Sequence, residues 1–284
     1  MSESERDLNR SNPWLFFGLA LGLTWLFWIP AALLPLAEPA WPVLALHYLG
    51  GVMPAAAAIL LLCTRHTSQE RRDYWQRIID FKRIGPKWYA AILLTVPALT
   101  ALAALGDVVL GGTGAELEAV ARFLDRPLAL VPFAIFMLLF GPLPEEVAWR
   151  GYGLEGLQNR RNALVSSLIL GAVWTAWHLP LFFIDGSYQH GLGVGTQGFW
   201  LFILDKVPQS ILMTWIYNNT RRSTLSAVLL HFMVNFVGEL FGLAPRAEVL
   251  YIVLWWMAAA SVTAIWGPER LVRRERLELE GRAA

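Results

Sequence analysis

The chain has 284 residues, of which 56% are hydrophobic and only 16% charged, and its mean hydropathy is +0.47. Soluble domains carry about a quarter charged residues, so this composition excludes an ordinary soluble globule as well as a collagen-like or disordered chain. The 23 basic and 22 acidic residues give a formal charge of +1 without a basic domain, which excludes a nucleic acid as partner. The single cysteine, Cys63, has no second cysteine with which to form an internal disulfide.

Eight apolar stretches follow one another along the chain, each long enough for a membrane-spanning helix of about 20 residues. They are too long for the alternating segments of roughly 10 residues in an outer-membrane barrel. We therefore predict an all-α, polytopic membrane protein with eight transmembrane helices around a polar intramembrane cavity, and a single domain over residues 1–284. The predicted spans are 14–36, 41–63, 88–110, 128–146, 163–184, 198–217, 223–243 and 249–267.

Basic residues are distributed unevenly between the two sides of the predicted membrane. Of the 23, 19 fall in the two tails and in the connections on their side, three fall on the opposite side, and Lys206 lies inside the sixth span. Positively charged loops tend to remain in the cytoplasm. We predict an integral protein of the cell inner membrane with both termini in the cytoplasm.

The longest connection on the predicted cytoplasmic side has the pattern of an interfacial helix. Its sequence, SQERRDYWQRIIDFKR, places Tyr74, Trp75, Ile78 and Ile79 on one helical face and the arginines largely elsewhere. This segment is either a gate or lipid-surface contact, or a solvated connector with an aromatic anchor.

Three ionisable residues close the fourth predicted span, in the segment GPLPEEVAWRGYG. An unpaired ionisable group at a helix centre costs about 2.5–3.5 kcal/mol, so such groups must be paired, hydrated or functional. Glu146 and Arg150 are four residues apart and can form an ion pair, whereas Glu145 is turned about 100° away and is the candidate base. We expect Pro142 and Pro144 to break the incoming helix and restart it before the glutamates. The alternative is an ordinary charged helix end with an i,i+4 pair.

The fifth and seventh predicted spans carry further polar groups. His178 follows Trp174 by four residues, and His231 and Asn235 are also four apart, so that the latter two can offer donors to one oxyanion. At 1.5 Å per residue, His178 would lie ~22 Å from the cytoplasmic start of its span, deeper than Glu145. A kink in the fourth helix, or a fifth helix that starts outside the bilayer, would bring the two level.

The sixth span is interrupted by Asp205 and Lys206, which either line a wet cavity or pair locally. Glu239, one turn beyond Asn235, belongs to the same cavity or reaches the far interface. Together with Trp174, these residues are the predicted lining of the cavity.

A carboxylate base, histidines and paired donors inside a membrane favour hydrolysis of a peptide bond by activated water. The marks of other intramembrane proteases are missing from the sequence: there is no His-Glu-x-x-His, no Gly-x-Ser-Gly, and Gly106-Asp107 is preceded by Ala104-Leu105. Water is therefore the predicted nucleophile.

Three motifs in this order resemble the CPBP family of intramembrane proteases, which includes type II CAAX prenyl endopeptidases and bacteriocin-processing, Abi-like enzymes. The resemblance covers roughly residues 128–243, and an aromatic Trp174 stands where the family usually has phenylalanine. The motifs are Glu145-Glu146-x-x-x-Arg150, Trp174-x-x-x-His178 and His231-x-x-x-Asn235.

The resemblance implies a role for each motif residue and a peptide or lipopeptide as substrate, with the lipid bilayer as surroundings. Glu145 and His178 would activate the water, His231 and Asn235 would stabilise the oxyanion, and the remaining pair, Glu146 and Arg150, would hold the site. We predict no cofactor, and a divalent metal on Glu145, His178 and His231 is the alternative.

Two other functions fit the same polar residues. A proton- or ion-coupled transporter would use Glu145, Glu146, Asp205 and Lys206 as a relay, although the sequence has no inverted repeat. A catalytically idle scaffold or immunity protein would bind a partner helix without needing any of them.

Overall fold

The computed structural model describes residues 11–35 and 40–273, and in these ranges the chain is almost entirely helical. Six helical stretches are long and apolar enough to cross a membrane, in keeping with an integral membrane protein. The outer parts of both tails, including Arg6 and Arg10 that entered the predicted orientation, lie outside the described residues. The six stretches are Pro13–Leu33 (α2), Trp41–Arg65 (α3), Pro86–Val109 (α5), Pro127–Gln158, Ala163–Phe183 and Pro245–Trp266 (α14).

The other two predicted spans are helices as well, but they do not belong to these six. Helix α12 (Gln197–Asn219) is long enough but carries Asp205 and Lys206 near its middle, and α13 (Thr224–Leu240) is apolar but has only 17 residues. The number of eight membrane crossings therefore stays a prediction.

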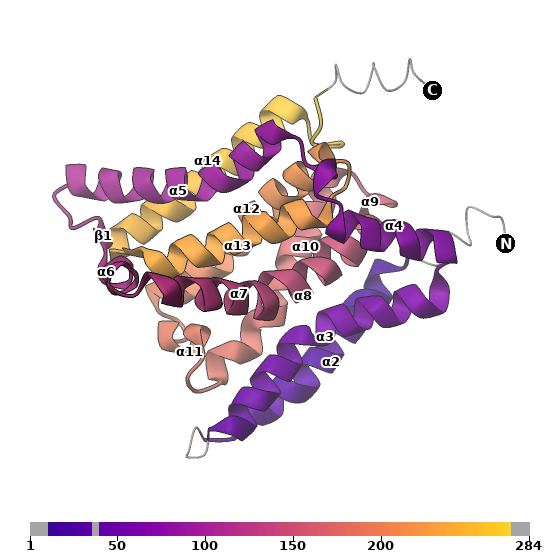
Figure 1. Ribbon diagram of the computed structural model, residues 1–284, viewed down its shortest axis with the longest axis horizontal. Coiled ribbons are helices and arrows are strands. Elements are labelled where there is room, and N and C mark those ends of the chain that lie inside the picture. The colour runs from indigo at the N-terminus through magenta and orange to yellow at the C-terminus, as the bar shows by residue number, and fades with distance from the viewer. Residues whose placement is uncertain (1–10, 36–39, 274–284) are drawn as a thin grey trace.

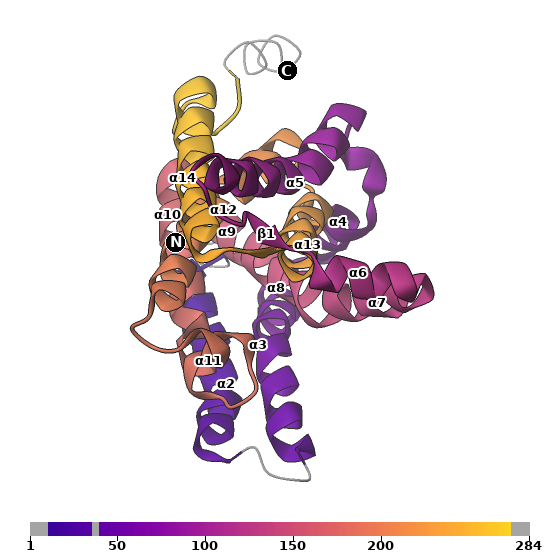
Figure 2. The ribbon, with the colours of Figure 1, turned by 90° about the vertical axis from the view of Figure 1, so that its left-hand side faces the viewer.

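The helices form two groups joined through α8 (Pro142–Ala148). Helices α2 and α3 lie side by side as an antiparallel hairpin, at the lower right of Figure 1 and the bottom of Figure 2. In the second group, α10 (Ala163–His178) packs on α12, α12 on α14, α14 on α5, and α5 on α13. Helix α8 contacts α3 on one side and α13 on the other, so the segment with the two glutamates lies at the centre of the molecule.

Short elements connect these helices. A two-residue strand β1 (Ala115–Glu116) pairs antiparallel with β2 (Gly242–Leu243) and ties the segment after α5 to the end of α13. The remaining connecting elements are α4 (Ser68–Ile79), η1 (Phe81–Arg83), α6 (Glu118–Asp125), η4 (Leu179–Phe183) and α11 (Tyr188–Leu192).

The fourth apolar stretch is a series of short helices and not one continuous rod. Its first part, α7, ends before Gly141, whose φ of −131° and ψ of −95° turn the chain, and Pro142 then starts α8 because proline suits the first helical position. This confirms the predicted break before the glutamates. The series consists of η2 (Pro127–Ala129), α7 (Leu130–Phe140), α8, the π-helical turn η3 (Trp149–Gly153) and α9 (Leu154–Gln158).

The predicted interfacial helix exists as α4, and protein covers only part of its apolar face. Tyr74 and Ile78 are buried, whereas Trp75 is 42% and Ile79 71% exposed, so one edge of this face meets protein and the other does not. The reason is that α4 packs its inner side against η3 and α13, which cover only one half of the helix. Periodicity alone could not separate the half that meets protein from the half that does not.

Helices α2 and α3 approach closely at Gly50. The Trp28 indole donates to the His47 carbonyl at 2.8 Å, the Thr24 hydroxyl donates to the Gly50 carbonyl at 3.1 Å, and the Trp28 ring occupies the space that a side chain at Gly50 would need. A Cβ at this position would lie 2.2 Å from Trp28 Nε1, whereas a Cβ at Gly51 would have no neighbour within 4 Å.

We expect Gly50→Ala to lower the free energy of unfolding by about 1–3 kcal/mol, the usual cost of overpacking. Gly51→Ala is the matched control and should be neutral or slightly stabilising, because alanine is the better helix former. Thermal unfolding of both variants in detergent measures the difference, and equal melting temperatures would contradict the close contact.

Candidate active site

The predicted catalytic residues line one cavity of about 380 Å³. Glu145 reaches it from α8, His178 from the end of α10, and His231 and Asn235 from α13. The remaining predicted lining residues are Trp174, Asp205, Lys206 and Glu239, which all line the same cavity. The three motifs thus meet in space, although up to 90 residues separate them in the sequence.

Glu145 lies in the first turn of α8 and is 8% exposed. The Trp174 indole donates to its Oε2 at 2.6 Å. A hydrogen bond to a charged oxygen is stronger than one between neutral groups, so Trp174 fixes the direction of this carboxylate. Sequence analysis predicted only a lining role for Trp174, and its position one turn before His178 is the signal that could have suggested more.

Glu146 and Arg150 form the predicted ion pair, which is confirmed. Arg150 Nη1 donates to Glu146 Oε1 at 2.8 Å, and both side chains are completely buried. The same oxygen also accepts from His231 Nδ1 at 2.9 Å. This second contact joins α8 to α13 across 85 positions of sequence, and nothing in the motif spacing predicted it.

In both histidines, an oxygen acceptor next to Nδ1 shows which ring nitrogen carries the proton. His178 Nδ1 lies 2.7 Å from the Trp174 carbonyl, which can only accept, so Nδ1 carries a proton and Nε2 is the basic nitrogen of the neutral ring. His231 likewise donates from Nδ1 to the Glu146 carboxylate. In both residues Nε2 is the nitrogen that remains for chemistry.

Trp174 lies between the two imidazoles. Its ring centroid is 5.7 Å from that of His178 and 5.1 Å from that of His231, the latter edge-to-face. The Arg150 guanidinium stacks against the Trp174 ring at 4.9 Å, a cation–π contact. One indole therefore contacts residues of all three motifs.

Asp205 and Lys206 pair locally and also line the cavity, so both readings of the sequence apply. Gln209 donates to Asp205 Oδ2 at 2.5 Å, and the Lys206 ammonium lies 3.4 Å from the same oxygen. The ammonium also lies 4.2 Å from the Phe202 ring centroid. Glu239 is exposed, at the edge of the cavity.

No group of three or more His, Cys, Asp or Glu side chains that could hold a metal ion occurs among residues 11–35 and 40–273. The carboxylate of Glu145 is directed at an indole and that of Glu146 at a guanidinium and an imidazole. The prediction of a site without a cofactor stays a prediction.

The buried ion pair leads to a stability prediction. Arg150→Met should cost about 3–5 kcal/mol, because it leaves the buried Glu146 carboxylate with a single donor. The double variant Glu146→Gln, Arg150→Met removes both charges and should lose less than the single variant. Denaturant unfolding of the two proteins measures this, and a double variant that is less stable than Arg150→Met would contradict the coupling.

Comparison with known proteins supports the family suggested by the motifs. A family model described as type II CAAX prenyl endopeptidase Rce1-like matches residues 127–237, the range that holds all three motifs. The chain is also 28% identical over 255 residues to the CAAX prenyl protease 2 of Methanococcus maripaludis, an alignment that covers 88% of this chain and 93% of that protein. In the segment that carries the three motifs, and over most of its length to this relative, the chain is similar to type II CAAX prenyl endopeptidases.

Proposed function

We propose that the protein is an intramembrane endopeptidase that hydrolyses a peptide bond in a lipid-modified, CAAX-like or membrane-embedded peptide. The observation that carries the proposal is the position of the Glu145 carboxylate, which shares one cavity with His178, His231 and Asn235. The relative in Methanococcus maripaludis is named a CAAX prenyl protease, which agrees with this chemistry. A transporter or an idle scaffold is not favoured by either comparison.

In the proposed reaction, Glu145 and His178 activate a water molecule. The water oxygen attacks the carbonyl carbon of the scissile bond while one water proton passes to the Glu145 carboxylate, with His178 Nε2 as the second acceptor that orients the water. A tetrahedral intermediate with a negatively charged oxygen results. The C–N bond then breaks, and the proton moves from Glu145 to the leaving nitrogen.

Asn235 and His231 are the proposed donors to the negatively charged oxygen. Asn235 lies close to the start of α8, since its Nδ2 would be 3.5 Å from a Cβ on Gly141. His231 already donates from Nδ1 to Glu146, so donation from Nε2 requires the doubly protonated ring. Removing one such donor typically costs about 100- to 1,000-fold in turnover.

Glu146 and Arg150 hold this arrangement in the proposal and do not contact the reacting atoms. Their ion pair is completely buried, and through Glu146 it fixes the orientation of the His231 ring. This is the support that a buried carboxylate gives to a catalytic imidazole elsewhere in enzymes.

The cavity walls agree with a substrate that carries an apolar group. A volume of about 380 Å³ lies at the lower end of the range for small-molecule pockets, roughly 300–1,000 Å³. The lining combines polar groups such as Glu145 with apolar ones. The aromatic and aliphatic lining residues include Tyr48, Phe136, Met137, Phe140, Phe202 and Val234.

The predicted orientation is also part of the proposal: an inner-membrane protein with cytoplasmic termini and a substrate that enters from the cytoplasmic side. The bias of Lys and Arg toward the connections on that side supports it. We further propose that the reaction uses no metal. Metal content of the purified protein, with activity measured before and after chelation, tests this part alone.

The activity is tested with a fluorogenic lipopeptide in proteoliposomes. Glu145→Gln and His178→Asn should each lower kcat by at least about 100-fold, the usual contribution of a general base, without a matching loss of stability. Glu118→Gln on the exposed side of α6 is the matched control and should cleave like the wild type. Retained cleavage by Glu145→Gln, or proton flux without any cleavage by the wild type, would refute the proposal.

A further inference from the structure

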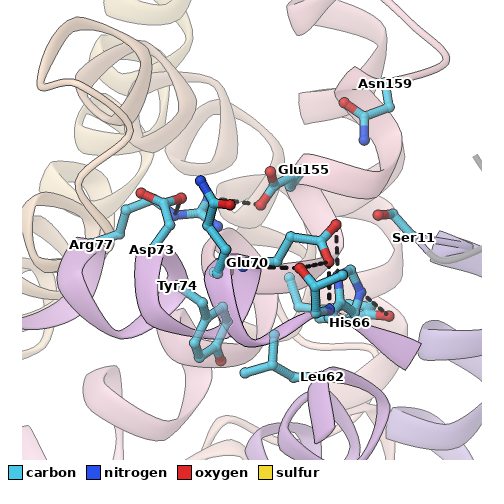
Figure 3. Close-up of a pocket in the computed structure, with 13 residues that line it drawn as sticks. Ser11, Leu62, His66, Glu70, Asp73, Tyr74, Arg77, Glu155 and Asn159 are labelled. Atoms are coloured by element: carbon cyan, nitrogen blue, oxygen red, sulfur yellow. Dashed lines mark hydrogen bonds and ion pairs between the residues drawn. The ribbon is translucent and has the colours of Figure 1, made fainter. Parts of the chain in front are cut away.

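Helix α4 reaches the active-site helices from outside the cavity. Its inner face meets the run from α8 to α9, and a second cavity of about 380 Å³ lies at this junction, lined by residues of α3, α4, η3 and α9. Figure 3 shows Tyr74 and Arg77 of α4 at this junction, with Glu155 of α9 opposite them. None of these three residues lines the cavity that contains Glu145.

The first contact is a hydrogen bond from Tyr74 to the backbone of α8. Tyr74 is 2% exposed, and its hydroxyl donates to the Val147 carbonyl at 2.8 Å. Burial is the main cause that raises the pKa of Tyr74, so the phenol keeps the proton that it donates. The Tyr74 ring also covers Gly151, where a Cβ would lie only 3.1 Å from Tyr74 Cε2.

The second contact is an ion pair from Arg77 to α9. Arg77 Nη1 donates to Glu155 Oε2 at 2.7 Å and to the Tyr217 hydroxyl at 2.9 Å, and Nε lies 3.0 Å from Asp73 Oδ2. Burial alone would lower the pKa of Arg77, but Tyr217, Glu155 and Asp73 together raise it above its ordinary value. The guanidinium is therefore charged and firmly held.

The two contacts lie on either side of the π-helical turn η3. Val147 precedes this turn and Glu155 follows it, while Arg150 lies within it. A π-helical turn is a rare, wider winding that is frequent at functional sites. If it tightened to an α-helix, the two flanking helices would turn relative to each other by about 100°, the rotation per residue. Glu146 and Arg150 could not both keep their partners after such a rotation.

We propose that Tyr74 is a positioning residue for the active site: through the Val147 carbonyl it holds the π-helical turn and so keeps Glu145 and Glu146 directed at their partners. Arg77 holds the other end of this turn through its ion pair with Glu155. Helix α4 thus acts on the reaction without contacting the substrate. The kinetic part of this inference rests on the proposed peptidase function, whereas its structural part does not.

The test compares two variants that each remove one tyrosine hydroxyl. Tyr74→Phe loses the buried bond to Val147, and Tyr89→Phe loses an exposed hydroxyl–carbonyl bond to Phe81 at 3.0 Å. Tyr74→Phe should lower kcat about 10-fold with KM within twofold of the wild type, since small misplacements of a catalytic group can cost up to about 100-fold. Tyr89→Phe should leave both constants unchanged. Because a smaller folded fraction alone also lowers the apparent kcat at constant KM, kcat is expressed per folded protein; a purely structural role would then leave it at the wild-type value.

Hydrogen exchange of the amides in residues 145–155 provides the readout that does not depend on activity. It should be faster in Tyr74→Phe than in the wild type and unchanged in Tyr89→Phe. Unaltered exchange together with wild-type kcat in Tyr74→Phe would overturn the inference while leaving the peptidase proposal intact. If the wild type has no peptidase activity but only Tyr74→Phe shows faster exchange, the proposed function is refuted. The structural role of Tyr74 in holding the π-helical turn then still stands.

A second variant covers the case in which Tyr74→Phe does not fold. Gly151→Ala places a methyl group against the Tyr74 ring from the other side and keeps the hydroxyl. It should show the same fall in kcat at constant KM and the same faster exchange. If Gly151→Ala behaves like the wild type in both measurements, the inference is wrong.

Discussion

Two adjacent buried carboxylates, Glu145 and Glu146, must find separate partners in a largely apolar bundle, and the arrangement at the centre of the structure follows from this requirement. A buried charge is tolerated only when it is paired and hydrogen-bonded. Glu146 takes Arg150 from its own helical run and His231 from α13, and Glu145 takes the indole of Trp174 from α10. Satisfying two side chains thus fixes three segments of the chain relative to one another.

The same division of partners gives the two carboxylates different chemical properties. Glu146 is enclosed by an ion pair and an imidazole, with no exposed surface. Glu145 has one donor from Trp174 and faces a cavity. A carboxylate that is not neutralised by a guanidinium and that borders a space large enough for water is the one suited to accept a proton.

The spacing of residues in the sequence predicted the contacts within a single helical run, but it did not predict the contacts between helices. The i,i+4 pair of Glu146 and Arg150 and the break before Pro142 follow from local rules, and both occur. The contact of His231 with Glu146 joins distant segments, so no motif could reveal it. The part of α4 that protein covers could not be predicted for a related reason: it depends on the helices packed against α4. Family resemblance predicted which motifs belong together, but not that Trp174 would contact all of them.

The most direct measurement of the central claim is an experimental structure with a phosphinic peptide, which imitates the tetrahedral intermediate of water attack. One phosphinate oxygen should lie within about 3.2 Å of the Glu145 carboxylate, and the other should face Asn235 Nδ2 and His231 Nε2, within hydrogen-bond reach. A phosphinate group bound away from Glu145, with the cavity around Trp174 left unoccupied, would contradict the account.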